Sequence, residues 1–333
     1  MANVFVARRL PGRALQLLRE AGHDVDLWDE DLPPPPAVLA QRLRGADAIL
    51  SLLTERLSPA VLASLPRLRV VANMAVGYDN VDPAAAAELG IWLTNTPGVL
   101  AETTADFAFA LLLAAARRVV ESDRDTRAGG WQTWSPTGFL GPDVHGATLG
   151  IVGLGEIGEA VARRARGFAM RVLYTARSRK PSAERDLGVE WATFDGLLAA
   201  ADFVSIHVPL TPETRHLVGE DAFARMKRDA IVVNTARGGV IDQDALVRAL
   251  RRGQLRGAAL DVSDPEPLPL DHELFEFPNV IITPHIASAS EATRARMAEM
   301  AAGNIVAVLA GQEPANAVNR PAPAALLARK ANP

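Results

Sequence analysis

The chain has 333 residues, of which 49% are hydrophobic and 22% are charged, a composition typical of a globular protein with room for two domains. The formal net charge is −4 and no lysine- and arginine-rich block stands out, so nucleic acid is not expected as a partner. The absence of cysteine excludes disulfides and thiolate metal sites, and it suits a reducing compartment.

The first 98 residues or so alternate between strand and helix patterns. Short apolar runs alternate with amphipathic segments, and the pair Asp82-Pro83 has the character of a helix start. The tetraproline Pro33–Pro36 predicts a rigid, extended loop. This part of the chain is therefore expected to form one α/β unit. Its predicted strands are Val4–Ala7, Ala48–Leu52 and Arg69–Asn73, and its predicted helices are Ala14–Ala21 and Ala84–Leu89.

No targeting or membrane segment is expected. Met1–Val6 leads directly into a strand-like run without the apolar stretch of a signal peptide. The longest apolar run, Phe107–Ala116, is too short to span a bilayer and lies in a predicted buried helix, Ala101–Val119. We therefore expect a cytoplasmic protein.

A glycine-rich turn opens the second half of the chain. The apolar run Ala147–Val152 predicts a buried parallel strand, and Ala160 begins a helical pattern, so the sequence between them is a strand-to-helix turn. Gly153 permits the tight turn, Gly155 lets a pyrophosphate approach the backbone, and Gly158 lets the helix pack closely on the strand. A flexible loop is the alternative, but this context favours a dinucleotide site.

Further strands and helices alternate after this turn, which predicts a parallel, doubly wound sheet. The last helix, Glu291–Leu309, is expected to cross back to the first body, so that the first domain would be discontinuous. The predicted fold class is therefore α/β, with two Rossmann-like domains. The strands are expected at Arg171–Tyr174, Phe203–Val208, Ala230–Asn234, Gly257–Val262 and Val280–Thr283, with helices at Glu220–Met226 and Asp242–Leu250.

Three residues with complementary chemistry follow predicted strands. Arg237 has the planar fork that grips a carboxylate in two places, although it could be an ordinary surface arginine in a glycine turn. His285 has the side chain best suited to donate a proton near neutral pH, although a histidine there is often structural. Glu266, between two prolines, is the expected partner of the imidazole, with a solvated loop acid as the alternative. Together these three residues suit the reduction of a 2-keto acid.

The segment after the second strand of this sheet bears on cofactor choice. A site for NAD usually places an acidic residue there to bind the ribose hydroxyls, but the chain reads Thr175-Ala176-Arg177-Ser178-Arg179-Lys180. A 2′-phosphate would be attracted rather than repelled, so the sequence predicts NADP(H) as the preferred cofactor, with NAD(H) possible. A basic loop facing solvent is the alternative.

Four motifs in order resemble those of the D-2-hydroxyacid dehydrogenases: Gly153–Gly158, Asn234–Gly239, Leu260–Pro267 and Thr283–Ser288. The resemblance covers nearly the whole chain. Within the family, the pattern is most similar to the glyoxylate and hydroxypyruvate reductases.

This resemblance implies a dinucleotide-binding domain at 99–287, a substrate-binding domain made of 1–98 plus 288–333, and an active site in the cleft between them. It implies that Arg237 binds the substrate carboxylate and that His285 donates the proton, with Val76 and Gly77 adding backbone N–H groups. Asp261 would contact the nicotinamide carboxamide, or would simply cap a strand end. The cofactor contacts carried over are Thr104, Leu154, Gly155, Glu156, Ile157, Ala176, Arg177, Ser178, Val208, Pro209, Thr235, Ala236, Asp261 and Ser288.

The resemblance also implies a homodimer. The aromatic segment Gly129–Gly141 precedes the glycine turn, and in the family such an arm joins two subunits, with Trp134 expected near the neighbour's substrate. No group of histidine and acidic residues has metal-ligand spacing, so no metal is predicted.

Two alternatives remain open at this point. One is a sibling dehydrogenase that acts on phosphoglycerate, D-lactate, formate or phosphite. The other is a nucleotide-sensing scaffold that resembles the family's transcriptional co-repressors. Substrate-dependent oxidation of the cofactor would separate an enzyme from a scaffold.

Overall fold

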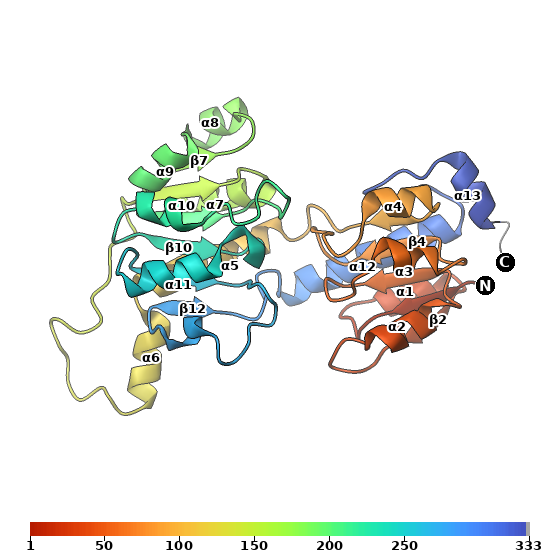
Figure 1. Cartoon of the computed structure of the whole chain (residues 1–333), viewed down its shortest axis with the longest axis horizontal. Coiled ribbons are helices and arrows are strands. Elements are labelled where there is room, and N and C mark those ends of the chain that lie inside the picture. The colour runs from red at the N-terminus through yellow and green to blue at the C-terminus, as the bar shows by residue number, and fades with distance from the viewer. Residues whose placement is uncertain (331–333) are drawn as a thin grey trace. The chain divides into compact units, whose positions relative to one another are not determined.

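The computed structural model describes residues 1–330, which divide into two compact units (Figure 1). Unit 1 is Met1–Leu100 together with the chain from Ala289 onward, and unit 2 is Ala101–Ser288. The predicted domain boundaries fell after residues 98 and 287. Each unit has a parallel sheet with helices, which confirms the predicted α/β fold class.

Unit 1 has a five-stranded parallel sheet in the order β2-β1-β3-β4-β5. Strand β3 pairs in parallel with β1 and with β4. Its residue Ile49 lies opposite Phe5 of β1 and opposite Val71 of β4. The elements are β1 (Asn3–Val6), α1 (Ala14–Glu20), β2 (Asp24–Leu27), α2 (Pro36–Leu43), β3 (Ala48–Ser51), α3 (Pro59–Ala63), β4 (Val70–Asn73), α4 (Pro83–Glu88), β5 (Trp92–Thr94), α12 (Glu291–Leu309) and α13 (Pro323–Lys330).

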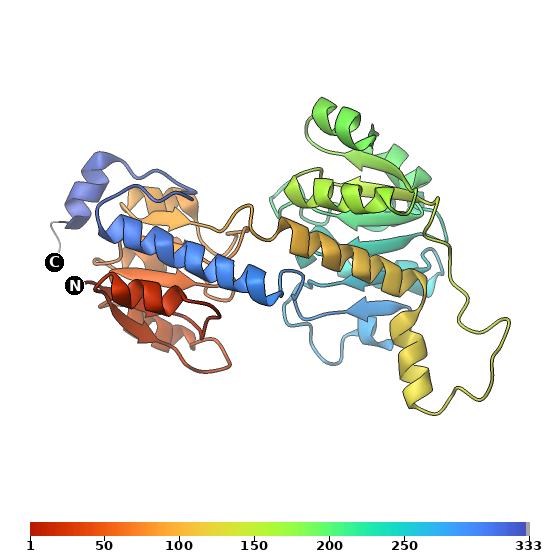
Figure 2. The ribbon, with the colours of Figure 1, turned by 180° about the vertical axis from the view of Figure 1, so that it is seen from behind.

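Helices cover both faces of the unit 1 sheet. Helices α1 and α12 lie side by side on one face (Figure 2), and α2, α3 and α4 cover the other (Figure 1). Alternate strand residues serve the two faces, and Phe5, Ile49 and Val71 pack with Leu43 and Leu62 of the second helical layer. The carboxyl ends of all five strands therefore meet at one edge, where the loops are free to carry function.

Unit 2 has a seven-stranded parallel sheet in the order β12-β11-β10-β9-β6-β7-β8. Its elements are α5 (Ala101–Ala116), α6 (Val119–Arg127), β6 (Thr148–Val152), α7 (Glu156–Arg166), β7 (Arg171–Thr175), α8 (Pro181–Leu187), β8 (Glu190–Trp191), α9 (Phe194–Ala200), β9 (Phe203–Ile206), α10 (Glu220–Arg225), β10 (Ile231–Asn234), a short 3₁₀ turn (Gly238–Val240), α11 (Gln243–Arg251), β11 (Gly257–Leu260), a second 3₁₀ turn (Glu273–Glu276) and β12 (Val280–Ile282).

The unit 2 sheet is also doubly wound. Helices α5 and α7 pack together on one face (Figure 2), where Ile151 and Val233 meet Leu112 and Val161. Helices α9, α10 and α11 lie on the opposite face (Figure 1) and bury residues such as Val232. Burial on both faces explains why these strands are continuous apolar runs.

The edge strands β2, β5 and β8 are not among the predicted strands, and two predicted elements differ from the structure. Pro36 is not part of an extended loop but the first residue of α2, a position where proline loses no hydrogen bond and its fixed φ suits the helix. The long helix of unit 2 ends at Ala116 rather than at Val119, because Arg118 has a left-handed φ of +52° and α6 begins after it. Among the described helices, none has the length and apolar character needed to cross a bilayer.

Candidate active site

The glycine turn joins β6 to α7, and the structure gives a different reason for glycine at each of its three glycine positions. Gly153 has a φ of +99°, a conformation that favours glycine. A Cβ on Gly158 would lie 2.3 Å from the carbonyl oxygen of Gly153, so only glycine allows α7 to approach this closely. A Cβ on Gly155 would meet no heavy atom within 4 Å, so this side of the turn is open.

The start of α7 is suited to an anion. Gly155 is its N-cap residue and provides no side-chain hydrogen bond to the first backbone N–H groups. These groups and the helix dipole can therefore serve a phosphate. Around the turn, Leu154 is buried, Ile157 is half-buried, and Gly155 and Glu156 are exposed.

The strand order locates the crevice in which such a sheet binds its ligand. The chain passes from β6 to β7 on one side and then returns to β9 on the other side of β6, so the connections diverge at β6. Ligands of open α/β sheets bind at this switch point, beyond the carboxyl ends of the strands. The neighbouring loops do lie against the glycine turn, because Gly153 N–H donates to Thr175 O and a Cβ on Gly153 would touch the backbone of His207.

The loop after β7 carries two exposed arginines, one of which forms an ion pair. Arg179 pairs with Glu184, with Nη2–Oε2 at 2.8 Å, and its guanidinium lies 5.8 Å from the centre of the Trp191 ring. Arg177 and Ser178 are exposed, and Ala176 is half-buried. The role of Arg177 in binding a cofactor phosphate stays a prediction.

The loop after β9 contains a partly buried polar contact between Ser205 and His207, a histidine at the end of a predicted strand. Nε2 of His207 lies 2.8 Å from Ser205 Oγ, and burial lowers the pKa of this imidazole to about 4. His207 is therefore neutral at physiological pH. Val208 is half-buried and Pro209 is exposed directly after it.

The loop after β10 carries Thr235, Ala236 and Arg237, and Asn234 holds it. The buried Asn234 side chain accepts from Ala236 N–H at 3.0 Å and donates to Arg237 O at 2.9 Å. Within residues 1–330, the buried Thr235 Oγ1 has no hydrogen-bond partner. A buried hydroxyl without a partner is costly in a finished structure, so this atom fits a site that a polar ligand completes.

Asp261, at the end of β11, organises the loop that carries His285. Its buried carboxylate accepts from Thr283 Oγ1 at 2.6 Å, Ile286 N–H at 2.9 Å and Ala287 N–H at 2.8 Å. Its carbonyl also accepts from the N–H of His285 at 2.9 Å. The strand-end cap expected as an alternative is thus present, and the contact with a carboxamide stays a prediction.

Glu266 and His285 lie together. Nδ1 of His285 is 2.6 Å from Oε1 of Glu266, and the two side chains are 25% and 41% exposed. A carboxylate at this distance fixes the ring orientation and places the proton of Nδ1 toward itself. Nε2 is then the nitrogen that can give a proton to a substrate.

The three candidate catalytic residues follow three neighbouring strands. Arg237 follows β10, Glu266 lies in the loop after β11 and His285 follows β12, and these strands are adjacent in the sheet. Arg237 is half-buried, and its Nη1 donates to Ala236 O at 2.8 Å. All three residues therefore lie at the carboxyl edge of the sheet that also carries the glycine turn.

The remaining predicted residues lie elsewhere. Thr104 is buried in α5, and Ser288 is the half-buried last residue of unit 2. Val76 and Gly77 belong to unit 1, in the loop after β4. Among the described residues, no group of three or more histidine and acidic side chains could hold a metal ion.

Comparison with known proteins indicates one enzyme family. The family model described as "D-isomer specific 2-hydroxyacid dehydrogenase, NAD binding domain" matches residues 109–287. A glyoxylate reductase from Korarchaeum cryptofilum is 54% identical over 319 residues, covering 96% of this chain and 96% of that protein. One from Thermococcus litoralis is 46% identical over 322 residues, covering 96% and 97%.

Solved structures are similar throughout. A protein from Thermus thermophilus matches with a TM-score of 0.90 and 50% identity, over 95% of this chain and 99% of that chain. An NADPH-dependent glyoxylate/hydroxypyruvate reductase from Sinorhizobium meliloti matches with a TM-score of 0.83 and 33% identity, over 96% and 98% of the two chains.

Proposed function

Because this chain belongs to the D-isomer specific 2-hydroxyacid dehydrogenase family, we propose that it reduces glyoxylate, and also hydroxypyruvate, to the corresponding 2-hydroxy acid. The reaction consumes one reduced nicotinamide cofactor and one proton for each keto acid. It is supported by identity to glyoxylate reductases over nearly the whole chain and by the His285–Glu266 contact. His285 and Glu266 suit the oxidoreductase activity of the family better than a role in binding a partner.

The proposed division of labour follows from the side chains. When bound, the reduced nicotinamide supplies the hydride that the carbonyl carbon receives. His285 donates a proton from Nε2 to the carbonyl oxygen, and Glu266 stabilises and orients the imidazole. Arg237 binds the carboxylate of the keto acid, and the backbone N–H groups of Val76 and Gly77 bind the same anion.

The residues present fit a dinucleotide. The open side of Gly155, the uncapped start of α7 and the buried Thr235 hydroxyl are the features that would receive it. Unit 2 is accordingly proposed as the dinucleotide-binding domain and unit 1 as the substrate-binding domain. A cytoplasmic location stays a prediction.

The decisive experiment is an assay of the purified protein against a panel of small acids with NADPH and NADH. We expect glyoxylate and hydroxypyruvate to have the highest kcat/KM, measured as loss of reduced-cofactor absorbance. Higher kcat/KM for pyruvate, or oxidation of phosphoglycerate, formate or phosphite, would point to a sibling dehydrogenase. Cofactor binding with no turnover of any substrate would instead favour the scaffold.

We further propose that NADPH is preferred over NADH. Arg177 is exposed after β7 and no acidic residue lies between Thr175 and Lys180, so this segment offers a 2′-phosphate a cation. The charge of Arg177 also interacts with the carboxylate of Glu213. Replacing Arg177 with Asp should move the ratio of kcat/KM values toward NADH by about tenfold or more. Replacing Arg179 with Asp is an informative comparison, because Glu184 and Trp191 already engage this guanidinium. A wild-type preference for NADH would contradict the proposal.

Finally, we propose a homodimer joined through the arm 129–141. Trp131, Trp134 and Leu140 are 70%, 78% and 61% exposed, which is a large apolar area to leave in water. Trp134 is proposed to lie near the partner's substrate.

A further inference from the structure

The loop after β4 shows how its backbone N–H groups are oriented. The carbonyl oxygen of Ala75 accepts from Thr96 N–H at 2.8 Å, and that of Val76 accepts from Asn95 Nδ2 at 2.9 Å. Both carbonyls are therefore directed toward the same short segment, residues 95–96 after β5. Neither acceptor bond depends on a residue of unit 2.

Peptide planarity then fixes the direction of the next two N–H groups. The peptides of this loop are trans, so the carbonyl of one residue and the N–H of the next point in opposite directions. With Ala75 O and Val76 O both held toward residues 95–96, the N–H groups of Val76 and Gly77 both point away from that segment. Within residues 1–330, neither N–H has a hydrogen-bond acceptor.

The next peptide is held by a second asparagine. Asn73, fully buried at the end of β4, donates from Nδ2 to Gly77 O at 2.8 Å. Its Oδ1 accepts from Ser51 Oγ and from Asn80 Nδ2, each at 3.3 Å. The side chain of Asn73 is therefore fixed at both of its polar atoms.

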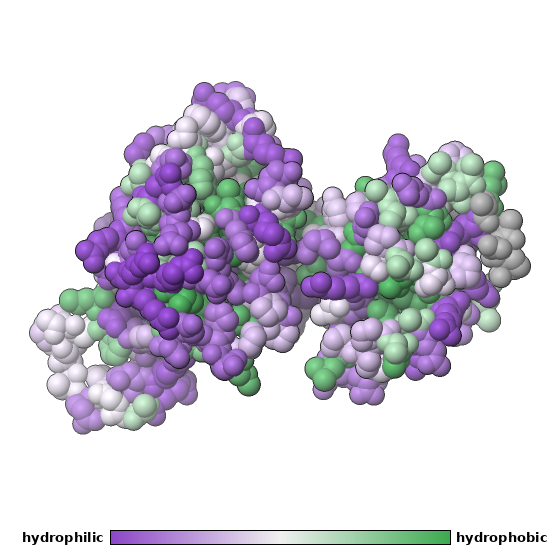
Figure 3. All heavy atoms as spheres, in the orientation of Figure 1, coloured by the Kyte–Doolittle hydropathy of each residue, from purple (hydrophilic) through white to green (hydrophobic). Residues whose placement is uncertain are grey.

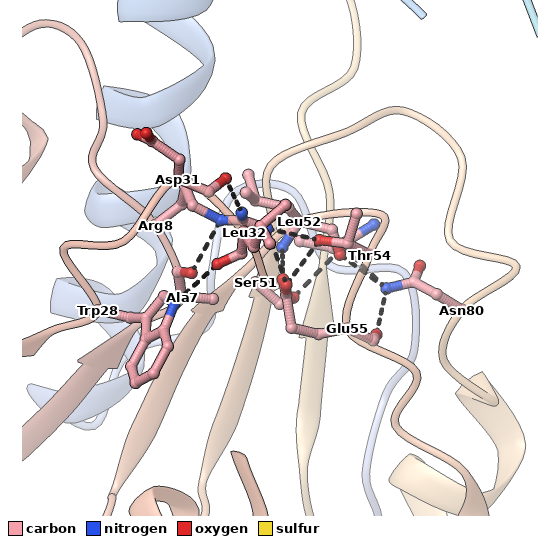
Figure 4. Close-up of polar contacts among 11 residues, drawn as sticks. Ala7, Arg8, Trp28, Asp31, Leu32, Ser51, Leu52, Thr54, Glu55 and Asn80 are labelled. Carbon is pink, nitrogen blue, oxygen red and sulfur yellow. Dashed lines mark hydrogen bonds and ion pairs between the residues drawn. The ribbon is translucent and has the colours of Figure 1, made fainter. Parts of the chain in front are cut away.

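Asn80, at the far end of the loop after β4, is anchored to the turn that follows β3 (Figure 4). Asn80 Nδ2 donates to Leu52 O at 3.0 Å and to Glu55 O at 2.9 Å. The buried Glu55 carboxylate holds this turn, because it accepts from Leu52 N–H and Thr54 Oγ1, each at 2.6 Å. Arg8, whose Nη2 is 3.7 Å from Glu55 Oε1, compensates its charge.

From these contacts we infer that Asn95 is a positioning residue that aims the Gly77 N–H group at the carboxylate of the substrate. The backbone N–H of Thr96 directs the Val76 N–H to the same side through Ala75 O, and Asn73 steadies the peptide that follows Gly77. The inference rests on the proposed function for the identity of the anion, since the geometry alone requires only a small carboxylate. Asn95 is the better of the two asparagines to mutate. It is half-buried and supports one peptide, whereas Asn73 is fully buried and its loss would disturb folding.

The test measures carboxylate binding separately from turnover. Oxamate, an unreactive analogue of a 2-keto acid, is titrated into the full-length protein with NADPH present, and heat is recorded. In Asn95→Ala, the Kd for oxamate and the KM for glyoxylate should each rise by about three- to tenfold, the equivalent of one net neutral hydrogen bond. The Kd for NADPH and kcat should stay within about twofold of wild type.

Two further variants make the result specific. Asn95→Gln restores an amide donor one methylene farther out and should recover part of the affinity. Asn3→Ala is the matched control, because Asn3 Nδ2 also donates to one backbone carbonyl of unit 1, that of Gly45, but at the amino end of β1. It should leave both oxamate affinity and KM unchanged.

The outcomes separate this inference from the proposed function. If Asn95→Ala binds oxamate like wild type, or if it loses NADPH affinity and thermal stability to the same extent, the positioning role is wrong. If the wild type binds no oxamate, the role is also wrong. If the wild type binds oxamate but turns over no keto acid, the proposed function fails, while the ratio of oxamate affinities still decides the role of Asn95.

Discussion

His285 has a backbone φ of +54°, a left-handed conformation that residues other than glycine rarely adopt. Such a conformation costs free energy and persists only where its surroundings determine it. Here Asp261 supplies this constraint through its carbonyl, which holds His285 N–H, and through its carboxylate, which holds Ile286 and Ala287. The position of the imidazole is therefore set before any substrate arrives.

The first prediction concerns His285 itself. His285→Ala should lower kcat for glyoxylate by about 10²- to 10⁴-fold, the usual contribution of a positioned acid, because proton transfer to the carbonyl oxygen is lost. Fluorescence titration should show unchanged NADPH affinity. Glu266→Gln should cause a smaller loss, since the ring keeps a neutral partner. His145→Ala, which removes an exposed loop histidine, is the control. Turnover of His285→Ala near the wild-type value would refute the assigned role.

The second prediction concerns the pH dependence of stability. Burial lowers the pKa of His207 to about 4, whereas the unfolded side chain titrates near 6.5. The stability contribution of the neutral ring is therefore fully present above about pH 6.5 and is lost as the pH falls toward about 4. We expect Tm to fall more steeply between about pH 7 and 5 in wild type than in His207→Gln. His145→Gln should retain the wild-type slope, and equal slopes in all three proteins would exclude this contribution.

At the scale of elements, the contact between β6 and α7 depends on one missing side chain. Gly158 lies where a Cβ would meet a backbone oxygen at 2.3 Å, which no rotamer change can relieve. The helix can begin at the sheet edge, and offer its N–H groups to an anion, only because this residue is glycine.

The third prediction follows from that contact. Gly158→Ala should destabilise unit 2 by about 1–3 kcal/mol, as overpacking does, and should weaken NADPH binding as α7 moves away from β6. Urea unfolding and NADPH titration measure the two effects. Gly167→Ala changes the C-cap residue of the same helix, where a Cβ would lie at an ordinary 3.4 Å from its neighbour. Both properties should be nearly unaffected there, and equal effects of the two substitutions would argue against the steric explanation.

At the scale of the whole molecule, the arm of unit 2, residues 129–141, leaves large side chains exposed. Figure 3 draws most of the arm in pale shades of intermediate hydropathy with a few green, hydrophobic atoms, and its two tryptophans are mostly exposed. The arm contributes little to the core of unit 2, whose apolar clusters contain none of residues 129–141.

The fourth prediction is that the protein is a dimer in solution. Light scattering at micromolar concentration should give twice the mass of 35.5 kDa, and a variant with Trp131, Trp134 and Leu140 replaced by serine should shift toward the monomer. Leu270→Ser is the control, because Leu270 is 94% exposed but lies outside the arm. A wild-type mass equal to one chain would rule out the dimer.

The sequence alone was sufficient for features whose causes are local. Apolar runs identified most of the parallel strands but not the short edge strands β2, β5 and β8, and the glycine spacing identified the turn between β6 and α7. The residue types at Arg237, Glu266 and His285 indicated keto-acid chemistry because few side chains can anchor a carboxylate or donate a proton near neutral pH.

Other features depended on backbone geometry and side-chain contacts that the residue pattern does not specify, and only the tertiary structure decided them. The break at Arg118 could not be read from the apolar pattern, because the pair that it forms with Glu121 depends on a local left-handed turn. The engagement of Arg179 by Glu184 and the loop contacts of Asn234 and Asp261 likewise required coordinates. Strand order placed β9 beside β6 and so created the switch point, because pairing between parallel strands is set by chain crossovers rather than by the composition of any one strand.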